Sequence, residues 1–495
     1  MRINTNMSAI IANAQLTKTE DKLALSLERL SSGYKINHSK DNPAGLAISQ
    51  KMNSQLRGLD QADSNAQDGV SVLQTAEGAL QEIQSMLTRI KELSVQAAND
   101  VNSVDERSAI QEEIDSLNKE IDRIAEDTDF NTKSLLNGNL QRRVYSNVPN
   151  VKQMEITDGF MDDTYGITIT DDAKKAVIEG SAIAMSDTEQ ITEELAGTVK
   201  INGLNVIIDE GDTLSDIATK LAKGTYMAGG TMINATPGAA LDKKAYGDTE
   251  GYASVPAASG SAFVFLSEAY GANESIKVEC DNPALAAKLG IPESRIATGD
   301  DVKADFTVDN GERVGFANSA TMSTYGQEIT VRDNNDKLFV VKVPGNVVAN
   351  NGGTVSMEQE VTDMGVLRVH VGANENQIIP MSLPEVSVET LGLDHINVFT
   401  HENASKAIEA VDNAVTSLAT IRSRIGAYQN RLEHTTSNLA VSEENLTAAY
   451  SRIMDVDMAE EMTEYTQANV LAQAGTSMLS QANSRPETAL QLLQG

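Results

Sequence analysis

Side chains that could do chemistry are few and scattered in this sequence. Its 495 residues include five His, a single Cys and no Trp. His401 and Glu402 are adjacent, but no second His follows at helical spacing, so the paired ligands of a zinc-protease helix are absent. Cys280 has no second thiol to pair with and no neighbouring His to activate it, so it is expected to be an inert small residue. The sequence therefore predicts no catalytic, cofactor-binding or metal site.

The strongest candidate for an ion site is an acidic run, Asp333 to Asp336. It offers the oxygen ligands that Ca²⁺ prefers, but it lacks the Gly and the downstream Glu of an EF-hand loop. It also lies between two expected strands, which favours a solvated turn. Phosphate-binding Gly-rich loops and the G-x-S-x-G elbow of hydrolases are missing as well. An enzyme is therefore the weakest of the functional hypotheses.

Composition points away from several partners. With 39 Lys and Arg against 71 Asp and Glu, the formal net charge is -32, which repels nucleic acid and anionic membranes. Aromatic residues make up 4% of the chain, which is scarce for the walls of an enzyme pocket. No apolar run reaches the roughly 18 residues of a membrane span, and the start does not resemble a secretory signal peptide. We expect a structural, self-assembling protein with no nucleic acid or membrane partner.

The first part of the chain is expected to be helical. Pro43 suits the first turn of a helix, with Asp41 or Asn42 as its cap, so the segment from Ser31 to Asn42 reads as a loop. The helix that follows is expected to end near Asn99. Its apolar residues recur at every seventh position, which is the seam of a coiled coil, and the clearest are Leu73, Leu80 and Leu87.

A second helix is expected to follow closely. Ser103 with Glu106 three residues later forms a capping box, and an apolar series continues to Ile124. The two helices together predict an αα-hairpin.

The last third has the most regular pattern. Seven apolar residues recur at spacings of seven without a gap: Val411, Leu418, Ile425, Leu432, Leu439, Leu446 and Ile453. Such a stripe needs a partner helix of similar length, because helix propensity alone is too weak to stabilise it. We expect the two chain ends to form one antiparallel α-helical coiled-coil rod. An intermolecular coiled-coil dimer is the alternative.

Between about residues 141 and 365 the chain is rich in Gly, Asp, Thr and Val, and strands are expected. Asn202-Gly203 lies between two alternating runs and fits a type I′ hairpin, and Asn310-Gly311 repeats the device. An amphipathic segment from Leu214 to Leu221 then completes a ββα unit. Further strands are expected at 262–266, 328–332 and 338–343. The fold class is α+β, with one or two β-rich domains inserted between helical ends.

Several motifs, in order, resemble those of the bacterial flagellins. They are Met1 to Asn6, Leu30 to Asn37, Asp41 to Ile48, Glu92 to Asn99, Arg422 to Leu432 and Ser451 to Ala459. The resemblance covers about 1–140 and 366–495, roughly half of the chain. It implies a subunit that polymerises into the flagellar filament, secreted by type III export and extracellular.

The resemblance also divides the chain into parts. They are an N-terminal inner-tube helix (1–40), N-terminal rod helices (41–140), a surface-exposed β-rich insert (141–365) that contains a ββα module (196–290), a rod-associated β-hairpin (366–400), a C-terminal rod helix (401–454) and a C-terminal inner-tube helix (455–495). The implied partners are further copies of the chain, a filament cap, hook-filament junction proteins and an export chaperone that holds the C-terminal helix.

Apolar side chains near both termini agree with an inner tube, because a lone chain would leave many of them in water. The candidates for contact between subunits are Ile3, Met7, Ile10, Leu16, Leu23, Met458, Met462, Leu471, Met478 and Leu479. We expect these ends to be disordered before assembly and to fold when copies join.

One more surface is implied by the resemblance. Arg89, Leu93 and Glu113 match positions that the flagellin-sensing Toll-like receptor of animal hosts recognises in the family. Packing between rod segments of neighbouring subunits is the competing role for these residues. The alternative function for the whole chain is a binding module, namely a minor hook-filament junction protein or an adhesive subunit whose insert binds ligands.

Overall fold

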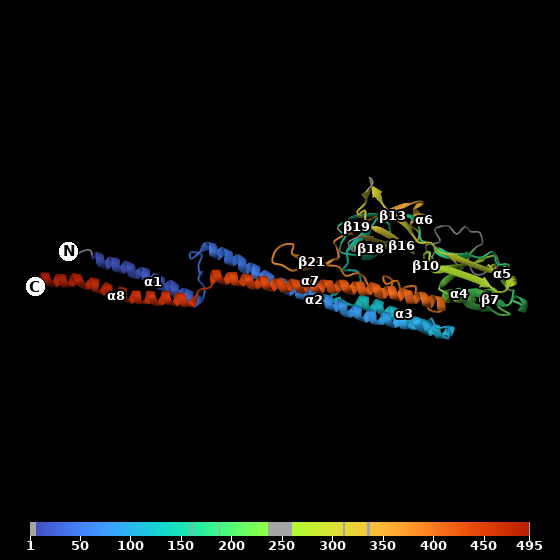
Figure 1. Cartoon of the computed structure of the whole chain (residues 1–495), viewed down its shortest axis with the longest axis horizontal. Helices are drawn as coiled ribbons and strands as arrows, with labels where there is room; N and C mark the ends of the chain where they lie inside the picture. Colours follow the sequence, from blue (N-terminus) through green and yellow to red (C-terminus); the bar gives the residue numbers. More distant parts are fainter. Residues whose placement is uncertain are drawn as a thin grey trace. The chain divides into compact units, whose positions relative to one another are not determined.

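The computed structural model describes residues 6–157, 159–160, 162–187, 189–235, 260–309, 312–333 and 337–494, with side chains omitted at 235 and 486–494. The chain divides into two compact units. The first holds Met1–Asp68, His370–Ile379 and Leu432–Gly495, and the second holds Gly69–Val369 and Pro380–Arg431. Figure 1 shows the order of the elements along the chain.

Helices from both ends of the chain build the first unit. It contains α1 (Met7–Ser32), α8 (Met458–Gln494), the start of α2 (Pro43–Ala97) and the end of α7 (His401–Met454). Gly33 ends α1 in the left-handed region at φ 76°, where glycine avoids a steric penalty. Asn42 accepts a hydrogen bond from the Gly45 amide and caps α2, as one of the two predicted caps.

The helical part of the second unit combines the rest of α2 and α7 with α3 (Val104–Asp127). The predicted capping box is confirmed, because Ser103 and Glu106 satisfy each other's amides at the start of α3. Ion pairs between α2 and α7 join Glu77 to Arg422 and Lys91 to Asp412. The residue numbers of the paired side chains rise along α2 as they fall along α7, so the two helices are antiparallel.

Two large hydrophobic cores and a small cluster of Ile233, Val264 and Leu266 lie within the described residues of the strand-rich insert. The first lies among β6 (Lys175–Glu179), β7 (Gly197–Ile201), β8 (Leu204–Ile208), α4 (Leu214–Met227), β9 (Gly230–Ala235), β10 (Ala262–Tyr270), β11 (Ser275–Cys280), α5 (Pro283–Leu289) and β12 (Ser294–Thr298). The strands form two antiparallel sheets of order β12-β11-β7-β8 and β6-β10-β9. The fully buried Phe263 and Phe265 of β10 lie in this core.

The second core lies between two four-stranded sheets, β13-β5-β19-β3 and β16-β17-β18-β4. Their strands are β3 (Arg143–Ser146), β4 (Lys152–Ile156), β5 (Asp163–Asp171), β13 (Lys303–Phe306), β16 (Thr321–Tyr325), β17 (Glu328–Asp333), β18 (Lys337–Lys342) and β19 (Val355–Thr362). The rings of Phe160, Tyr165, Phe316 and Phe339 pack against one another there. Three of the chain's eight Phe are buried in this core.

The remaining elements are short. They are β1 (Asp129–Phe130) and β2 (Lys133–Ser134), the 3-10 helix η1 (Glu193–Leu195), β14 (Val308–Asp309) and β15 (Glu312–Arg313), α6 (Val347–Asn351), and β20 (Leu367–His370) and β21 (Ile378–Met381). β20 and β21 pair in a two-stranded sheet within the segment where a hairpin was expected.

Of the two predicted Asn-Gly turns, the structure describes one. Asn202 and Gly203 join β7 to β8 with φ of 46° and 83°, which confirms the predicted type I′ geometry. Asn310-Gly311 lies outside the described residues, although the flanking β14 and β15 pair. The strands expected at 262–266, 328–332 and 338–343 are confirmed as β10, β17 and β18, and α4 confirms the expected amphipathic helix.

Candidate functional site

The two chain ends pair as antiparallel helices. Asn6 donates from its side chain to the carbonyl of Ala482 at 2.9 Å, and Arg29 Nη1 lies 3.5 Å from Glu461 Oε2 at the opposite end of the pair. Figure 1 shows α1 and α8 side by side. The candidate site is the surface that this helix pair presents.

Inside the pair, the packed side chains are mostly small or polar. On α8 the positions turned inward include Glu461, Ala468, Gly475 and Ala482, which are seven residues apart, and the half-buried Tyr465, Ala472 and Leu479 between them. Opposite them on α1, the buried residues are Leu16, Thr19 and Ser26. A methyl group built on Gly475 would lie 3.2 Å from Leu16 Cδ1, which shows how closely the helices approach. Among the described residues of the pair, Leu16 is the one large apolar side chain that is fully buried.

Outside the pair, large apolar side chains face solvent. The exposed fractions are 61% for Met7, 54% for Ile10, 64% for Ile11, 53% for Leu27, 50% for Met458, 48% for Met462, 59% for Val470, 53% for Leu471 and 65% for Met478. A surface helix of a single-chain globular protein normally turns such residues inward. In α1 and α8 these residues instead face solvent. Exposed apolar patches of this kind mark sites of protein association.

Most of the predicted inner-tube candidates belong to this exposed surface. Met7, Ile10, Met458, Met462, Leu471 and Met478 are exposed, as given above. Leu23 and Leu479 are half-buried, and Leu16 is buried against α8. Ile3 lies outside the described residues. Leu16 therefore serves the contact between α1 and α8 within one chain.

Backbone contacts connect the end of α1 to the start of α8. The Val456 amide donates to the Gly33 carbonyl at 3.0 Å, and the Lys35 amide donates to the Met454 carbonyl at 2.6 Å. In the following loop, Asp41 accepts hydrogen bonds from the amides of His38 and Asn37, and these bonds lower the pKa of its carboxyl. The loop is thus held by its own hydrogen bonds.

The predicted heptad residues differ in burial along α2 and α7. Those in the second unit, Leu73, Leu80, Leu87, Val411, Leu418 and Ile425, are at most 1% exposed. In the first unit, Leu432 and Leu439 are buried, whereas Leu446 and Ile453 are half-buried. The apolar stripe of α7 is thus less covered toward its C-terminal end.

The three residues matched to receptor recognition do not form one exposed cluster. Arg89 donates to Glu113 at 2.8 Å and to Glu92 at 3.2 Å, and the Arg89 and Glu113 side chains are about half exposed. Leu93 is 1% exposed. Because its side chain is covered, Leu93 cannot contact a partner in this conformation, and only Arg89 and Glu113 offer surface.

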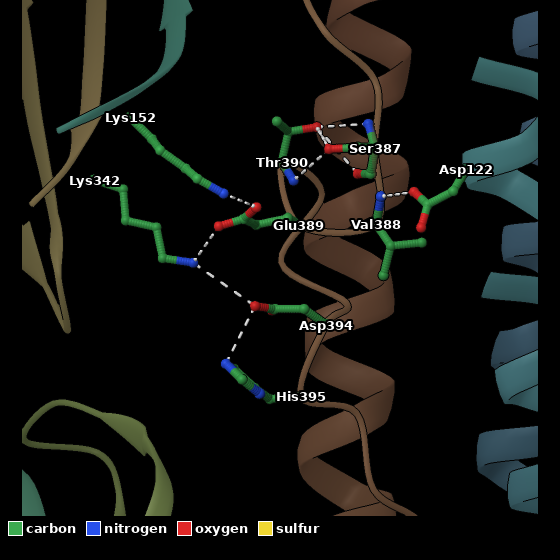
Figure 2. Close-up of polar contacts among 9 residues, drawn as sticks. All are labelled: Asp122, Lys152, Lys342, Ser387, Val388, Glu389, Thr390, Asp394 and His395. Carbon is green, nitrogen blue, oxygen red and sulfur yellow. Dashed lines mark hydrogen bonds and ion pairs between the residues drawn. The ribbon is translucent and has the colours of Figure 1, made fainter. Parts of the chain in front are cut away.

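The segment between β21 and α7 carries a polar network that was not predicted from the sequence. We define the connector as residues 382–400. Figure 2 shows Glu389 between two lysines of the insert, accepting from Lys152 at 2.7 Å and from Lys342 at 3.1 Å. Asp122 of α3 accepts from the Val388 amide at 2.8 Å. The connector therefore joins the strand-rich insert to the helices of the second unit.

The next residues of the connector extend this network. His395 Nε2 lies 3.2 Å from Asp394, and its Nδ1 lies 3.8 Å from Glu268 of β10. The nearby Glu268 carboxylate raises the pKa of His395, burial opposes the rise, and the charge of Asp394 adds to it. Burial by itself would raise the pKa of Glu389, but hydrogen bonds from Lys152 and Lys342 outweigh it and lower that pKa.

These contacts had no local signal in the sequence. Glu389 lies 237 residues from Lys152, and Glu461 lies 432 residues from Arg29, so no motif or periodicity relates the partners. The seven-residue spacing from Glu461 to Ala482 was the one signal that could have identified the inward stripe of α8.

Within the described part of the chain, no three His, Cys, Asp or Glu side chains lie close enough to hold a metal ion. Of the predicted acidic turn, Asp333 belongs to the described residues, and 334–336 lie outside them. None of the helices, over their described residues, is long and apolar enough to cross a bilayer.

Comparison with known proteins identifies relatives along the full chain. Residues 3–141 match the family model of the bacterial flagellin N-terminal helical region, and residues 408–493 match that of the C-terminal helical region. The flagellin of Clostridium tyrobutyricum is 32% identical over 487 residues, covering 98% of this chain and 100% of that protein. Flagellin D of Vibrio cholerae is 32% identical over 493 residues, covering 100% of this chain and 99% of that protein.

Solved structures give weaker overlaps. FliC from Burkholderia pseudomallei is 14% identical with a TM-score of 0.23, covering 73% of this chain and 99% of that one. The flagellar hook associated protein-3 from Legionella pneumophila is 14% identical with a TM-score of 0.30, covering 82% and 98%.

Proposed function

This chain belongs to the bacterial flagellins, and from that premise we propose that the outward apolar surface of α1 and α8 is where copies of the chain bind one another. Membership makes the chain a structural subunit of the flagellar filament, in a family of structural proteins and not of enzymes. The alternative of a junction or adhesive protein is not favoured, because the relatives that span the whole chain are flagellins.

The observation that carries the proposal is the reversed packing of the terminal helix pair. The fully buried residues between α1 and α8 are mostly small or polar, with Leu16 as the exception, while methionines and branched aliphatic residues face outward. Burying each large apolar side chain against a neighbour contributes roughly 1.5 to 3 kcal/mol. Several such residues on two helices are enough to drive association, and closed or helical assemblies of identical copies supply the matching surface.

The same observation supports folding on assembly. A helix pair that leaves most of its large apolar side chains exposed gains little from pairing alone, since isolated helices are marginal in water. The free energy that orders α1 and α8 then comes mainly from contacts with other copies. Hydrogen-exchange mass spectrometry on free chain and on filaments tests this, and slow exchange of both helices in the free chain would contradict it.

A matched pair of substitutions tests the surface itself. Met478→Glu on α8 and Ile207→Glu on β8 replace residues of similar exposure, 65% and 61%. We expect Met478→Glu to raise the critical concentration for polymerisation at least tenfold, because a charge cannot be buried unpaired between subunits. Ile207→Glu should leave it unchanged. Equal effects in sedimentation assays of the two variants would exclude the proposed surface.

Partners other than further copies of the chain are also proposed. We propose that the filament is extracellular, that cap and hook-filament junction proteins contact its ends, and that an export chaperone covers the exposed apolar residues of α8 before assembly. Excess chaperone should then inhibit polymerisation of the native chain in proportion to its occupancy of α8. Chaperone binding that survives deletion of residues 455–495 would contradict this role.

The exposed pair Arg89 and Glu113 is the proposed contact for the host receptor. A half-exposed Arg held by carboxylates is a common type of interface anchor. Arg89→Ala should weaken binding to the purified receptor ectodomain while filaments still form. If polymerisation fails and receptor binding persists, Arg89 serves packing between subunits instead.

A further inference from the structure

Methionines are prominent on the outward apolar surface of α1 and α8. Among the described residues, five methionines are exposed, and four of them lie on these two helices: Met7, Met458, Met462 and Met478. The fifth, Met364, lies between β19 and β20. Met1 and Met161 are outside the described residues. The proposed assembly surface therefore carries most of the thioether sulfurs that solvent reaches in the described chain.

Methionine differs chemically from the other apolar residues of this surface. Hydrogen peroxide transfers one oxygen atom to its sulfur: the O–O bond breaks, an S–O bond forms, sulfur loses two electrons and the peroxide is reduced to water. The aliphatic side chains of Ile10, Ile11, Val470 and Leu471 contain no sulfur. The sulfoxide is polar, and burying it without a hydrogen-bond donor is unfavourable. A mild oxidant can thus make the surface unfit for burial while its aliphatic residues stay unchanged.

Two of the four methionines lie one helical turn apart. Met458 and Met462 are separated by four residues, so their side chains are neighbours on α8. The carboxylates of this segment are Glu460, Glu461 and Glu464. An ionised carboxylate accepts hydrogen bonds and cannot donate one to a sulfoxide oxygen. Oxidation of both methionines would therefore add two further acceptors to a patch that already contains acceptors.

The oxidisable side chains of the insert are protected by packing. Met185 and Met357 are buried in the two large cores. Cys280 is also buried, and burial raises the pKa of its thiol, which leaves little of the thiolate that reacts with peroxide. In the free chain, peroxide should therefore modify α1 and α8 well before it reaches the cores.

We propose that the four exposed methionines of α1 and α8 are oxidation sites through which hydrogen peroxide reversibly prevents the free chain from joining a filament. Enzymatic reduction of methionine sulfoxide removes the added oxygen, so the block can be lifted. Within a filament, neighbouring copies would cover the same side chains and protect them. The inference rests on the proposed assembly surface, because burial between subunits is what makes the sulfoxides unfavourable.

Peptide mapping by mass spectrometry tests the accessibility of the sites. Free chain and filaments are treated with dilute hydrogen peroxide, and oxygen addition is followed at each methionine. In the free chain, we expect the four sites to react at least tenfold faster than Met185 and Met357. In filaments, their rates should fall at least tenfold. Equal rates at the four sites in free chain and filaments would overturn the proposal.

Sedimentation of oxidised chain tests the effect on assembly. We expect peroxide to raise the critical concentration of the native chain at least tenfold, and reduction of the sulfoxides to restore it. A matched control, Met364→Leu, should lose polymerisation after peroxide as the native chain does. In a variant with Leu at all four sites, a volume-conserving change, the critical concentration should be the same before and after peroxide, whatever its starting value. Equal loss in that variant and in the native chain would overturn the proposal.

Repair of the native chain decides the matter if the fourfold variant does not polymerise at all. Oxidised native chain must regain its original critical concentration once mapping shows the four sulfoxides reduced. If it does not, the damage lies elsewhere and the proposal fails.

Met478→Glu separates this inference from the proposed function. If that variant raises the critical concentration as expected while sulfoxides at all four sites do not, the assembly surface stands and only the oxidation inference fails. If Met478→Glu and Ile207→Glu have equal effects, the proposed function fails and the inference falls with it.

Discussion

Arg422 illustrates how a single side chain can fix two helices against each other. Its guanidinium lies 2.6 and 2.8 Å from Glu77 Oε1 and also bonds to Gln84 of α2. Both charged side chains are 30% exposed, so solvent screens them only partly. Arg422→Met keeps the apolar stem but leaves Glu77 without its cation. We expect a loss of about 1 to 2 kcal/mol in the free energy of unfolding, measured by denaturant titration.

Arg123 of α3 is the matched control at the same scale. It also pairs with two carboxylates, Glu120 and Asp127, but its side chain is 58% exposed. Exposed ion pairs contribute little because water already solvates both charges. Arg123→Met should therefore leave the unfolding midpoint unchanged. If the two substitutions destabilise the chain equally, burial is not what makes the Arg422 contacts matter.

Among the elements, the connector is the one whose attachment should depend on pH. The raised pKa of His395 means that its contribution is fully present below about 6.5, its ordinary value. That contribution is lost as pH rises through the higher folded-state pKa. The groups facing His395 are Glu268 on β10 and Asp394 on the connector, and Lys342 on β18 opposes them. We expect the connector to exchange amide hydrogens faster at pH 8 than at pH 6, after correction for intrinsic rates.

The opposite sign applies to Glu389. Because its folded-state pKa is lowered, its contribution is present above about 4.5 and is lost as pH falls. The connector should thus be held best between these two limits. His395→Gln should abolish the difference in amide exchange of the connector between pH 6 and pH 8. The faster exchange expected at low pH, where Glu389 is protonated, should remain. A native difference that persists in His395→Gln would mean that another group titrates.

For the molecule as a whole, the net charge of -32 sets the conditions of polymerisation. Copies with this charge repel one another, and the range of repulsion falls from about 30 Å at 0.01 M salt to about 8 Å at 0.15 M. Screening should therefore lower the critical concentration for filament formation over this range, measured by sedimentation. A critical concentration that rises with salt would indicate that ion pairs between subunits dominate assembly.

Some of this structure follows from neighbouring residues alone. The capping box of Ser103 and Glu106 and the turn at Asn202-Gly203 were predictable because each is decided within a few residues of backbone. The seven-residue stripe of α7 was visible because helical geometry places those side chains on one face. The family resemblance rests on the same kind of local pattern.

Other features required the tertiary structure. That Leu93 is covered while Arg89 is exposed depends on which helices pack beside α2. The Glu389 and Glu461 contacts join residues hundreds of positions apart, and no local preference encodes such pairs. Capping residues, turn residues and apolar spacing were therefore readable from the sequence. Which apolar faces stay uncovered was not, because burial depends on the neighbours that folding brings together.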